Sequence, residues 1–156
     1  AAKPSATGLK TVRGTATQAS ISFNNPGYCF SNGTFAADKN RDYLLMDSWA
    51  GIRGMENVVI SQLPDSMAEY CHVEIYGDCN TDRDMLYTVN GMVKTIQDRE
   101  NFSGTFNEGA NKVTLRYVPV VNGVITITGN GADSTRSAIN AVRLISPAPG
   151  IISFTA

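Results

Sequence analysis

The sequence has neither a long apolar run nor a strong charge of one sign. No stretch approaches the roughly 20 consecutive apolar residues needed to cross a bilayer, so we expect no membrane span. The 13 Lys and Arg residues nearly balance the 14 Asp and Glu residues, and no run of basic residues occurs. Because binding to DNA or RNA depends on clustered positive charge, we also expect no nucleic-acid partner.

Histidine and cysteine are scarce. The chain has one His and three Cys, with no Cys-x-x-Cys pair, which is too little for a usual Cys/His zinc site. His72 lies on the polar side of an alternating run, beside Tyr70 and Glu74, and no Gly-x-Ser-x-Gly motif supplies an activated serine. We therefore interpret His72 as a surface or cross-strand residue.

The three cysteines fall in different surroundings. Cys71 alternates with apolar residues, which predicts a buried thiol. Cys29 and Cys79 both lie in segments rich in Gly and Asn, which are typical of loops. Because two loop cysteines can oxidise in an exported protein, we predict a disulfide between Cys29 and Cys79.

The length of 156 residues fits one domain, which at this size hides roughly 70% of its unfolded surface. Residues 1–8 have the composition of a linker or a processing scar. We predict a single domain over residues 9–156, monomeric and cut from a larger protein.

The stretch from Glu69 to Asp98 predicts antiparallel β structure. Cys71, Val73 and Ile75 alternate with polar residues, and period two indicates a strand with one buried face. A polar loop over residues 77–83 follows, and then two apolar runs flank Asn90-Gly91. Asn-Gly between such runs is the strongest short-range hairpin signal, because both turn residues must adopt positive φ.

The rest of the chain repeats this pattern without a convincing amphipathic helix. In residues 111–118, Val113, Leu115 and Tyr117 share one face, and Asn122-Gly123 repeats the hairpin signal. We predict an all-β fold, a two-sheet antiparallel β-sandwich of jelly-roll type. The other predicted strands cover residues 19–23, 43–46, 55–61, 101–109, 124–128 and 136–145.

Several short segments in this order resemble galactose-binding-like and malectin-like β-sandwich domains of secreted bacterial proteins. The resemblance spans roughly residues 19–145, and its most specific part is Ile139-Asn140-Ala141-Val142. Many such domains are carbohydrate-binding modules attached to polysaccharide-degrading enzymes. The resemblance therefore implies a jelly-roll sandwich, a glycan ligand, attached catalytic or cell-surface domains, and a secreted or cell-surface location. The other segments are residues 21–23, 49–51, 63–64, 73–78 and 87–91.

The only Trp is the candidate centre of a sugar site. An indole offers a flat apolar face to the CH-lined side of a pyranose, and small residues flank Trp49. Charged neighbours could bind hydroxyls through charge-assisted hydrogen bonds. Sugar modules often carry two or three such aromatics, and a Trp that closes one end of the core is the alternative. The predicted carbohydrate-binding residues are Trp49, Asp47, Arg53, Tyr28, Arg83 and Arg136.

Clustered acids leave two kinds of chemistry open. Glycoside hydrolysis normally needs two carboxylates beside a cleft, whereas Ca²⁺ takes clustered carboxylates and carbonyls. The first acidic loop lacks the Gly and terminal Glu of an EF-hand loop. Asp133 and Asn130 form a second calcium candidate, so we expect no required cofactor and leave a structural calcium ion open. The first loop carries Asp78, Asn80, Asp82 and Asp84.

The sequence is compatible with three functions. The first is a non-catalytic carbohydrate-binding module, favoured by the resemblance and by the lack of a catalytic constellation in the sequence. The second is a structural or adhesive β-sandwich spacer, which a buried Trp49 and a groove without aromatics would favour. The third is a small polysaccharide hydrolase or lyase, which two carboxylates facing each other in a cleft would favour.

Overall fold

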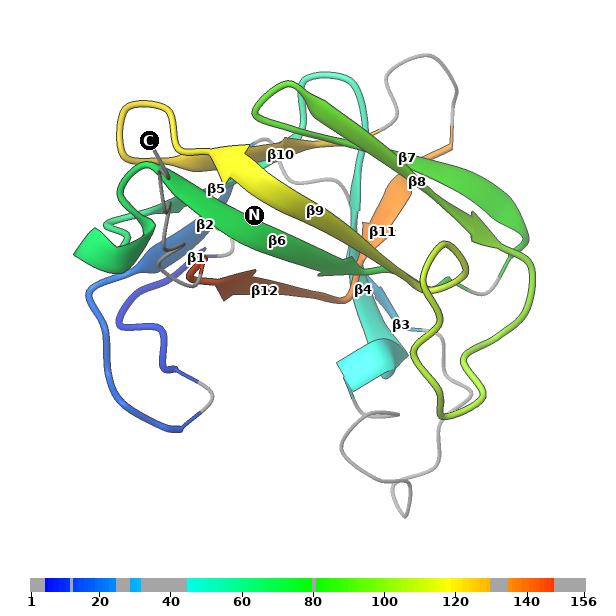
Figure 1. Cartoon of the computed structure of the whole chain (residues 1–156). Helices are drawn as coiled ribbons and strands as arrows, with labels where there is room; N and C mark the ends of the chain where they lie inside the picture. The colour runs from blue at the N-terminus through cyan, green and yellow to red at the C-terminus, as the bar shows by residue number, and fades with distance from the viewer. Residues whose placement is uncertain are drawn as a thin grey trace, which may run out of the picture.

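A computed structural model describes residues 5–11, 13–24, 29–31, 45–79, 81–129 and 135–147, with the backbone alone for residues 29–31. Over these ranges the chain is nearly all β and every strand pairing within the sheets is antiparallel (Figure 1). The predicted all-β antiparallel sandwich is confirmed. No helix within the described ranges has the length and apolar character that spanning a membrane requires.

The described strands form one large sheet and two small ones. The six-stranded sheet has the order β1-β2-β5-β10-β7-β8, and the three-stranded sheets have the orders β12-β6-β9 and β11-β4-β3. A short 3₁₀ helix, η1 (Asp65–Met67), precedes β6. The strands are β1 (Ser5–Ala6), β2 (Ser20–Asn24), β3 (Cys29–Ser31), β4 (Ser48–Ile52), β5 (Asn57–Ser61), β6 (Tyr70–Tyr76), β7 (Arg83–Val89), β8 (Met92–Asp98), β9 (Lys112–Pro119), β10 (Ile125–Thr128), β11 (Ser137–Ile139) and β12 (Ala141–Ile145).

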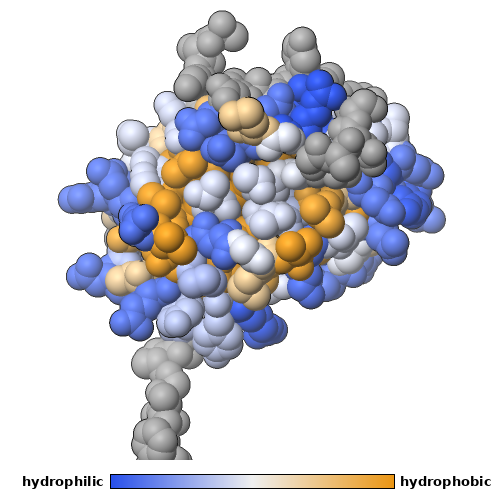
Figure 2. Space-filling model, turned by 90° about the horizontal axis from the view of Figure 1, so that it is seen from above, coloured by the Kyte–Doolittle hydropathy of each residue, from blue (hydrophilic) through white to orange (hydrophobic). Residues whose placement is uncertain are grey.

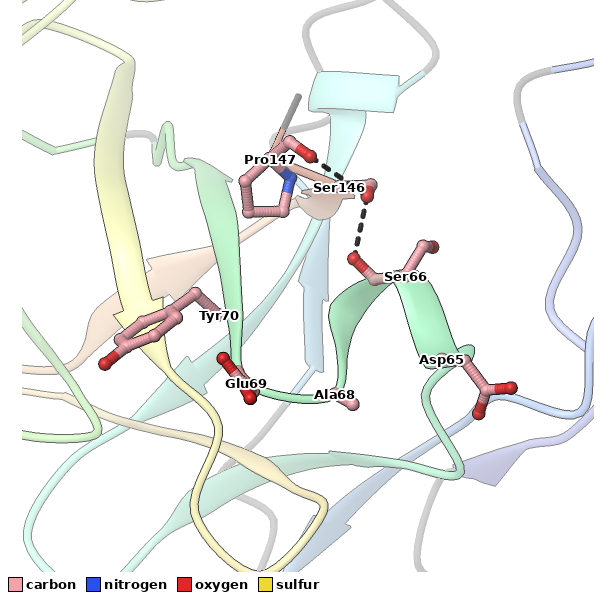
Figure 3. A pocket seen from close by; sticks show the side chains of 7 residues that line it. All are labelled: Asp65, Ser66, Ala68, Glu69, Tyr70, Ser146 and Pro147. Carbon is pink, nitrogen blue, oxygen red and sulfur yellow. Dashed lines mark hydrogen bonds between the residues drawn. The ribbon is translucent and has the colours of Figure 1, made fainter. Parts of the chain in front are cut away.

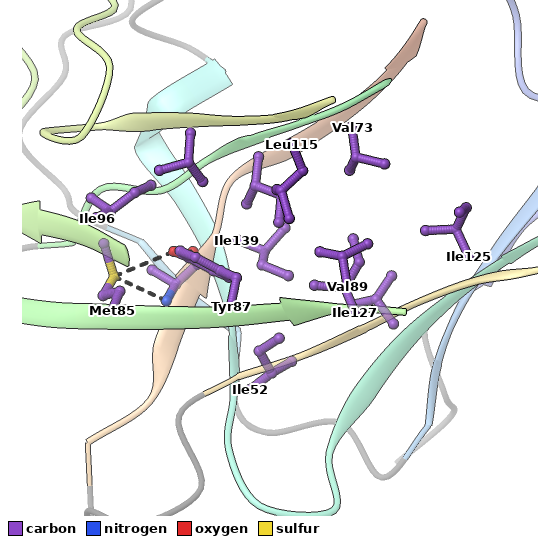
Figure 4. Packing of buried hydrophobic residues seen from close by; sticks show 14 of the residues in the cluster. Ile52, Val73, Met85, Tyr87, Val89, Ile96, Leu115, Ile125, Ile127 and Ile139 are labelled. Atoms are coloured by element: carbon purple, nitrogen blue, oxygen red, sulfur yellow. Dashed lines mark hydrogen bonds between the residues drawn. The ribbon is translucent and has the colours of Figure 1, made fainter. Parts of the chain in front are cut away.

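The core lies between these sheets, where the apolar side of each alternating strand turns inward (Figure 4). Val73 of β6 belongs to the same buried cluster as Val89 and Ile127 of the six-stranded sheet. Ile52 and Ile139, from the β11-β4-β3 sheet, also belong to this cluster. Each fully buried aliphatic side chain of this kind stabilises the fold by about 1.5–3 kcal/mol. Burial of one face therefore explains why the period-two pattern specifies both register and sheet.

The outer face of the six-stranded sheet carries hydroxyl and small apolar side chains. Thr126 lies opposite Val59, and Thr88 lies opposite Val93, on the side facing away from the buried residues. Seen from above, pale and orange residues occupy the middle of the surface and blue hydrophilic residues border it (Figure 2). This face adds few charges to the molecule.

Four predicted segments differ from the observed elements. The predicted strand 136–145 is two strands, because Asn140 turns the chain from β11 into β12; its backbone N–H donates to Tyr76 O and its side-chain Nδ2 donates to Met46 O. Residues 45–47 are helical rather than extended. Ser5–Ala6, inside the predicted linker, pairs with β2 as a short exposed edge strand. Residues 101–109 hold no strand.

Candidate functional site

Trp49 is a core residue. Its side chain is 5% exposed and packs in the central hydrophobic cluster, and the guanidinium carbon of Arg83 lies 5.7 Å from its ring centroid. The adjacent Gly51 leaves room for the ring, since a Cβ there would lie 3.1 Å from Trp49 Cζ3. The prediction that Trp49 offers its face to a sugar is therefore wrong for this structure, and the alternative of a core Trp holds.

The three predicted arginines lie close together, where their contacts join separate segments of the protein to one another. Arg136 Nη2 lies 2.9 Å from Glu56 Oε1, and the backbone N–H of Arg53 donates to the other carboxylate oxygen at 3.0 Å. Arg83 Nη1 donates to the backbone carbonyl of Arg136 at 3.3 Å. These partly buried contacts join the β4–β5 turn to β7 and to the start of β11. Asp47, another residue of the predicted sugar site, is half-buried just before β4.

Several predicted site residues lie outside the described residues. They are Tyr28 of the sugar site, Asn130 and Asp133 of the late loop, and Asn80 of the acidic loop. The calcium prediction therefore stays a prediction. Within the ranges that the structure covers, no group of three or more His, Cys, Asp or Glu side chains is arranged to hold a metal ion.

Cys79 is a buried free thiol in this structure, and the side chain of Cys29, its predicted disulfide partner, lies outside the described residues. The chain turns inward after β6, and Cys79 Sγ donates to Asp98 Oδ2 at 3.0 Å while its backbone N–H donates to the same oxygen at 2.9 Å. Burial, with the hydrogen bond to Asp98, raises the pKa of Cys79 to about 12. Cys71 is also a buried free thiol, as predicted.

Asp78 and Asp98 form a buried acidic pair. Their side chains belong to residues that are 0% and 1% exposed. Burial raises the pKa of Asp78 to about 7, and the charge of Asp98 adds to the effect; burial also raises the pKa of Asp98. Asp98 was not among the predicted site residues, although extending the alternation two residues past the inward Ile96 places it on the core face.

The strongest surface feature is a β-bulge between β6 and β9. The register shifts between Cys71 and Val73, and Tyr117 at the bulge has φ 54°. The backbone N–H of Tyr117 donates to His72 Nδ1 at 2.9 Å, and the two rings meet edge to face with centroids 4.6 Å apart. Bulges re-aim side chains and recur beside functional sites, and here the bulge leaves Tyr117 61% exposed.

Tyr70 extends this surface along β6. It is 48% exposed and lies opposite Pro119, while Val121 beyond β9 is 50% exposed. We call the outward side chains Tyr70, His72 and Tyr117 the bulge face. Together they offer two exposed phenol rings and one imidazole on one side of a rigid sheet.

An open pocket adjoins the Tyr70 end of the bulge face. It encloses about 480 Å³ between η1 and the residues after β12. Ser146 Oγ donates to Ser66 O at 2.8 Å across it, whereas Tyr70 and Asp65 point to opposite sides (Figure 3). The pocket is lined by Asp65, Ser66, Ala68, Glu69, Tyr70, Ser146 and Pro147.

Charged groups border the other end of the bulge face. Glu74 lies 3.6 Å from Arg143 Nη1 on β12 and 4.0 Å from Lys112 Nζ on β9. Tyr76 Oη donates to the same carboxylate at 2.8 Å. Donors and acceptors therefore continue along β6 beyond the exposed rings.

No protein-family model, curated protein or solved structure matches the chain. The resemblance to galactose-binding-like and malectin-like domains therefore rests on the sequence segments alone, and the bulge face has to be interpreted from its own chemistry.

Proposed function

We propose that this domain is a non-catalytic carbohydrate-binding module and that the bulge face is where it binds glycan. The observation that carries the proposal is the exposure of Tyr117 and Tyr70 on one side of a rigid sheet. A phenol ring presents an apolar face to the CH side of a pyranose and a hydroxyl to its polar edge. His72 and the charged groups around Glu74 add hydrogen-bonding partners for sugar hydroxyls.

The sequence resemblance supports the same function and adds its setting. We propose that the domain belongs to a secreted or cell-surface protein and holds a polysaccharide near an attached catalytic or cell-surface domain. Tethering raises the local concentration of the substrate without any chemistry in the domain itself.

The other two functions receive different support. The buried Trp49 favours a structural or adhesive spacer, but Tyr70 lines a pocket, and a spacer has no need of an exposed aromatic there. A hydrolase needs two carboxylates facing each other in a cleft. Asp78 and Asp98 are neighbours, yet both are shielded from solvent, so this pair does not support hydrolysis.

A glycan array with the purified domain tests the proposal. We expect binding to at least one glycan class, and Tyr117→Ala should weaken it about tenfold, because an aromatic contact is worth about 0.5–1.5 kcal/mol beyond the area it buries. Alanine carries a Cβ, as tyrosine does, so the variant has the same backbone restriction at this positive-φ position. Val93→Ala is the matched control, because Val93 is 54% exposed on β8 of the six-stranded sheet. This variant should bind like the parent. Absence of binding to every glycan would favour the spacer.

A further inference from the structure

The protonation state of His72 is tied to the backbone of Tyr117. His72 Nδ1 accepts the Tyr117 N–H at 2.9 Å. An imidazole nitrogen accepts a hydrogen bond only when it carries no proton, so this hydrogen bond requires a ring that is neutral with its proton on Nε2. Protonation of Nδ1 would set the Nδ1–H and the Tyr117 N–H, both donors, against each other and break this hydrogen bond.

Tyr117 needs such support because its backbone is strained. It has φ 54°, in the left-handed region that bulky side chains rarely adopt. Val118 pairs with Cys71 and Leu115 with Val73, so Arg116 and Tyr117 are the two residues opposite His72 at the bulge. Strained conformations persist only where the surroundings fix them. The hydrogen bond to His72 and the edge-to-face ring contact at 87° supply that restraint.

The charged groups around His72 come from all three strands of the sheet. On β6, Glu74 lies two residues beyond His72 on the same face. The hydroxyl of Tyr76, two residues further on, donates to the Glu74 carboxylate. Arg116 of β9 is exposed at the bulge, and Arg143 of β12 lies opposite Glu74. Arg143 and Lys112 both form ion pairs with Glu74, so their positive charges offset its negative charge. Glu108, whose carboxylate accepts from the backbone and hydroxyl of Thr114 opposite Glu74, and Tyr70 are further titratable groups of this face.

We propose that His72 is a positioning residue, which holds Tyr117 in its bulged, exposed conformation while neutral and releases it when protonated. The consequence for binding rests on the proposed function: the bulge face binds glycan best while His72 Nδ1 carries no proton, and protonation of the imidazole lowers the affinity. His72 acts through Tyr117, so the tyrosine ring is the group that contacts the sugar.

Nuclear magnetic resonance of the ¹⁵N-labelled full chain tests the coupling directly, because the chain has a single His. We expect an unprotonated Nδ1 at neutral pH, and the Tyr117 amide signal should move on acidification with the same midpoint as the His72 ring. A Tyr117 amide that stays fixed while His72 titrates, or a neutral ring protonated on Nδ1, would overturn the proposal.

Two variants separate positioning from general stability. His72→Asn keeps an acceptor, Oδ1, at the same number of bonds from Cα but cannot be protonated, so Tyr117 should keep its neutral-pH signal from pH 5 to pH 8. His72→Phe lacks the acceptor, and its Tyr117 amide should resemble that of the acidified parent at every pH. If His72→Phe fails to fold, His72→Asn still decides: a Tyr117 signal that moves with pH as in the parent contradicts the proposal.

Binding at pH 7.5 and pH 5 supplies the functional readout on the same glycan array. The parent should lose about fivefold to tenfold of its affinity at pH 5, the change expected from one lost hydrogen bond. His72→Asn should lose none, which also controls for other titrating groups such as Asp78. An equal loss in both proteins would overturn the proposal. The magnetic resonance readouts contain no glycan, so coupled titration without any glycan binding would refute the proposed function and still support the positioning role of His72.

Discussion

Asp78 lies buried against Asp98, and its protonation is coupled to folding. Burial raises its pKa to about 7 in the folded protein, whereas an ordinary Asp has a pKa near 4. The folded state therefore binds more protons than the unfolded state between these values, and linkage requires that stability fall as pH rises through this window. The contribution is fully present below about pH 4 and is lost as the pH approaches and passes about 7.

Asp78→Asn should remove much of this pH dependence. The amide has the shape of the protonated acid but no charge to bury, so the variant should match or exceed the parent in stability at pH 7.5. Urea unfolding at several pH values from 4 to 8 measures the effect. Asp82→Asn, at an exposed position in the same loop, is the control and should keep the slope of the parent. A parent whose stability rises steadily over this range would contradict the account.

Trp49 illustrates how burial decides the role of a residue. Its ring fills the core and is covered by Arg83, so Trp49→Ala should destabilise the fold by about 3–5 kcal/mol, as large-to-small core substitutions do. Chemical unfolding followed by circular dichroism measures this. Tyr117→Ala, at an exposed ring, should change stability far less. A Trp49→Ala protein as stable as the parent would mean that the ring is not part of the core.

At the scale of elements, the two Asn-Gly turns have similar backbones but different settings. Asn90-Gly91 joins the paired strands β7 and β8, whereas Asn122-Gly123 closes only an isolated bridge between Val121 and Val124. Because β9 and β10 belong to different sheets, the hairpin predicted at the second turn is not formed. Asn90-Gly91 and Asn122-Gly123 all have positive φ, as both turns require. Only Asn90 reaches beyond its own turn among these four residues: its Nδ2 donates to Pro119 O at 2.8 Å and to Val124 O at 3.0 Å. This amide therefore ties the β7–β8 hairpin to β9 and to the strand that follows.

Asn90→Asp should destabilise the protein by about 2 kcal/mol, because it removes two donated hydrogen bonds and sets a carboxylate against two carbonyls. Asn122→Asp is the matched control, since Asp also tolerates positive φ and Asn122 is exposed. Thermal unfolding of the two variants should show a lower Tm for the first alone. Equal shifts in both would show that turn conformation, not the bridging amide, determines the effect.

Most strands, the β7–β8 hairpin and both tight turns were predictable from sequence because they depend on local pattern. Period-two alternation gave the strands of the sandwich, and Asn-Gly gave both tight turns. The break at Asn140 was not predictable, since it depends on partners far away in sequence, the backbone of Tyr76 and of Met46. The bulge was missed for a related reason: one inserted residue turns Tyr117 outward and gives its place on the core face to Val118.

At the scale of the molecule, two clusters lie toward different ends of the sandwich. β6 starts beside η1, away from β3 and β4 (Figure 1), so the bulge face and the Trp49 region are separate. Trp49, Arg83 and Arg136 do lie near one another, but residue type alone could not distinguish a buried structural network from a ligand site. The exposure of Tyr117 depends on a register shift that only the paired strands reveal.

Glycan binding at the bulge face can be located by amide chemical-shift mapping of the labelled chain, with an oligosaccharide of the class that gives the strongest array signal. We predict that the largest shifts fall on Tyr70, His72 and Tyr117 and spread along β6 and β9. Shifts confined to the segments around Arg53 and Arg136, or no shifts at a saturating concentration of that oligosaccharide, would contradict the account.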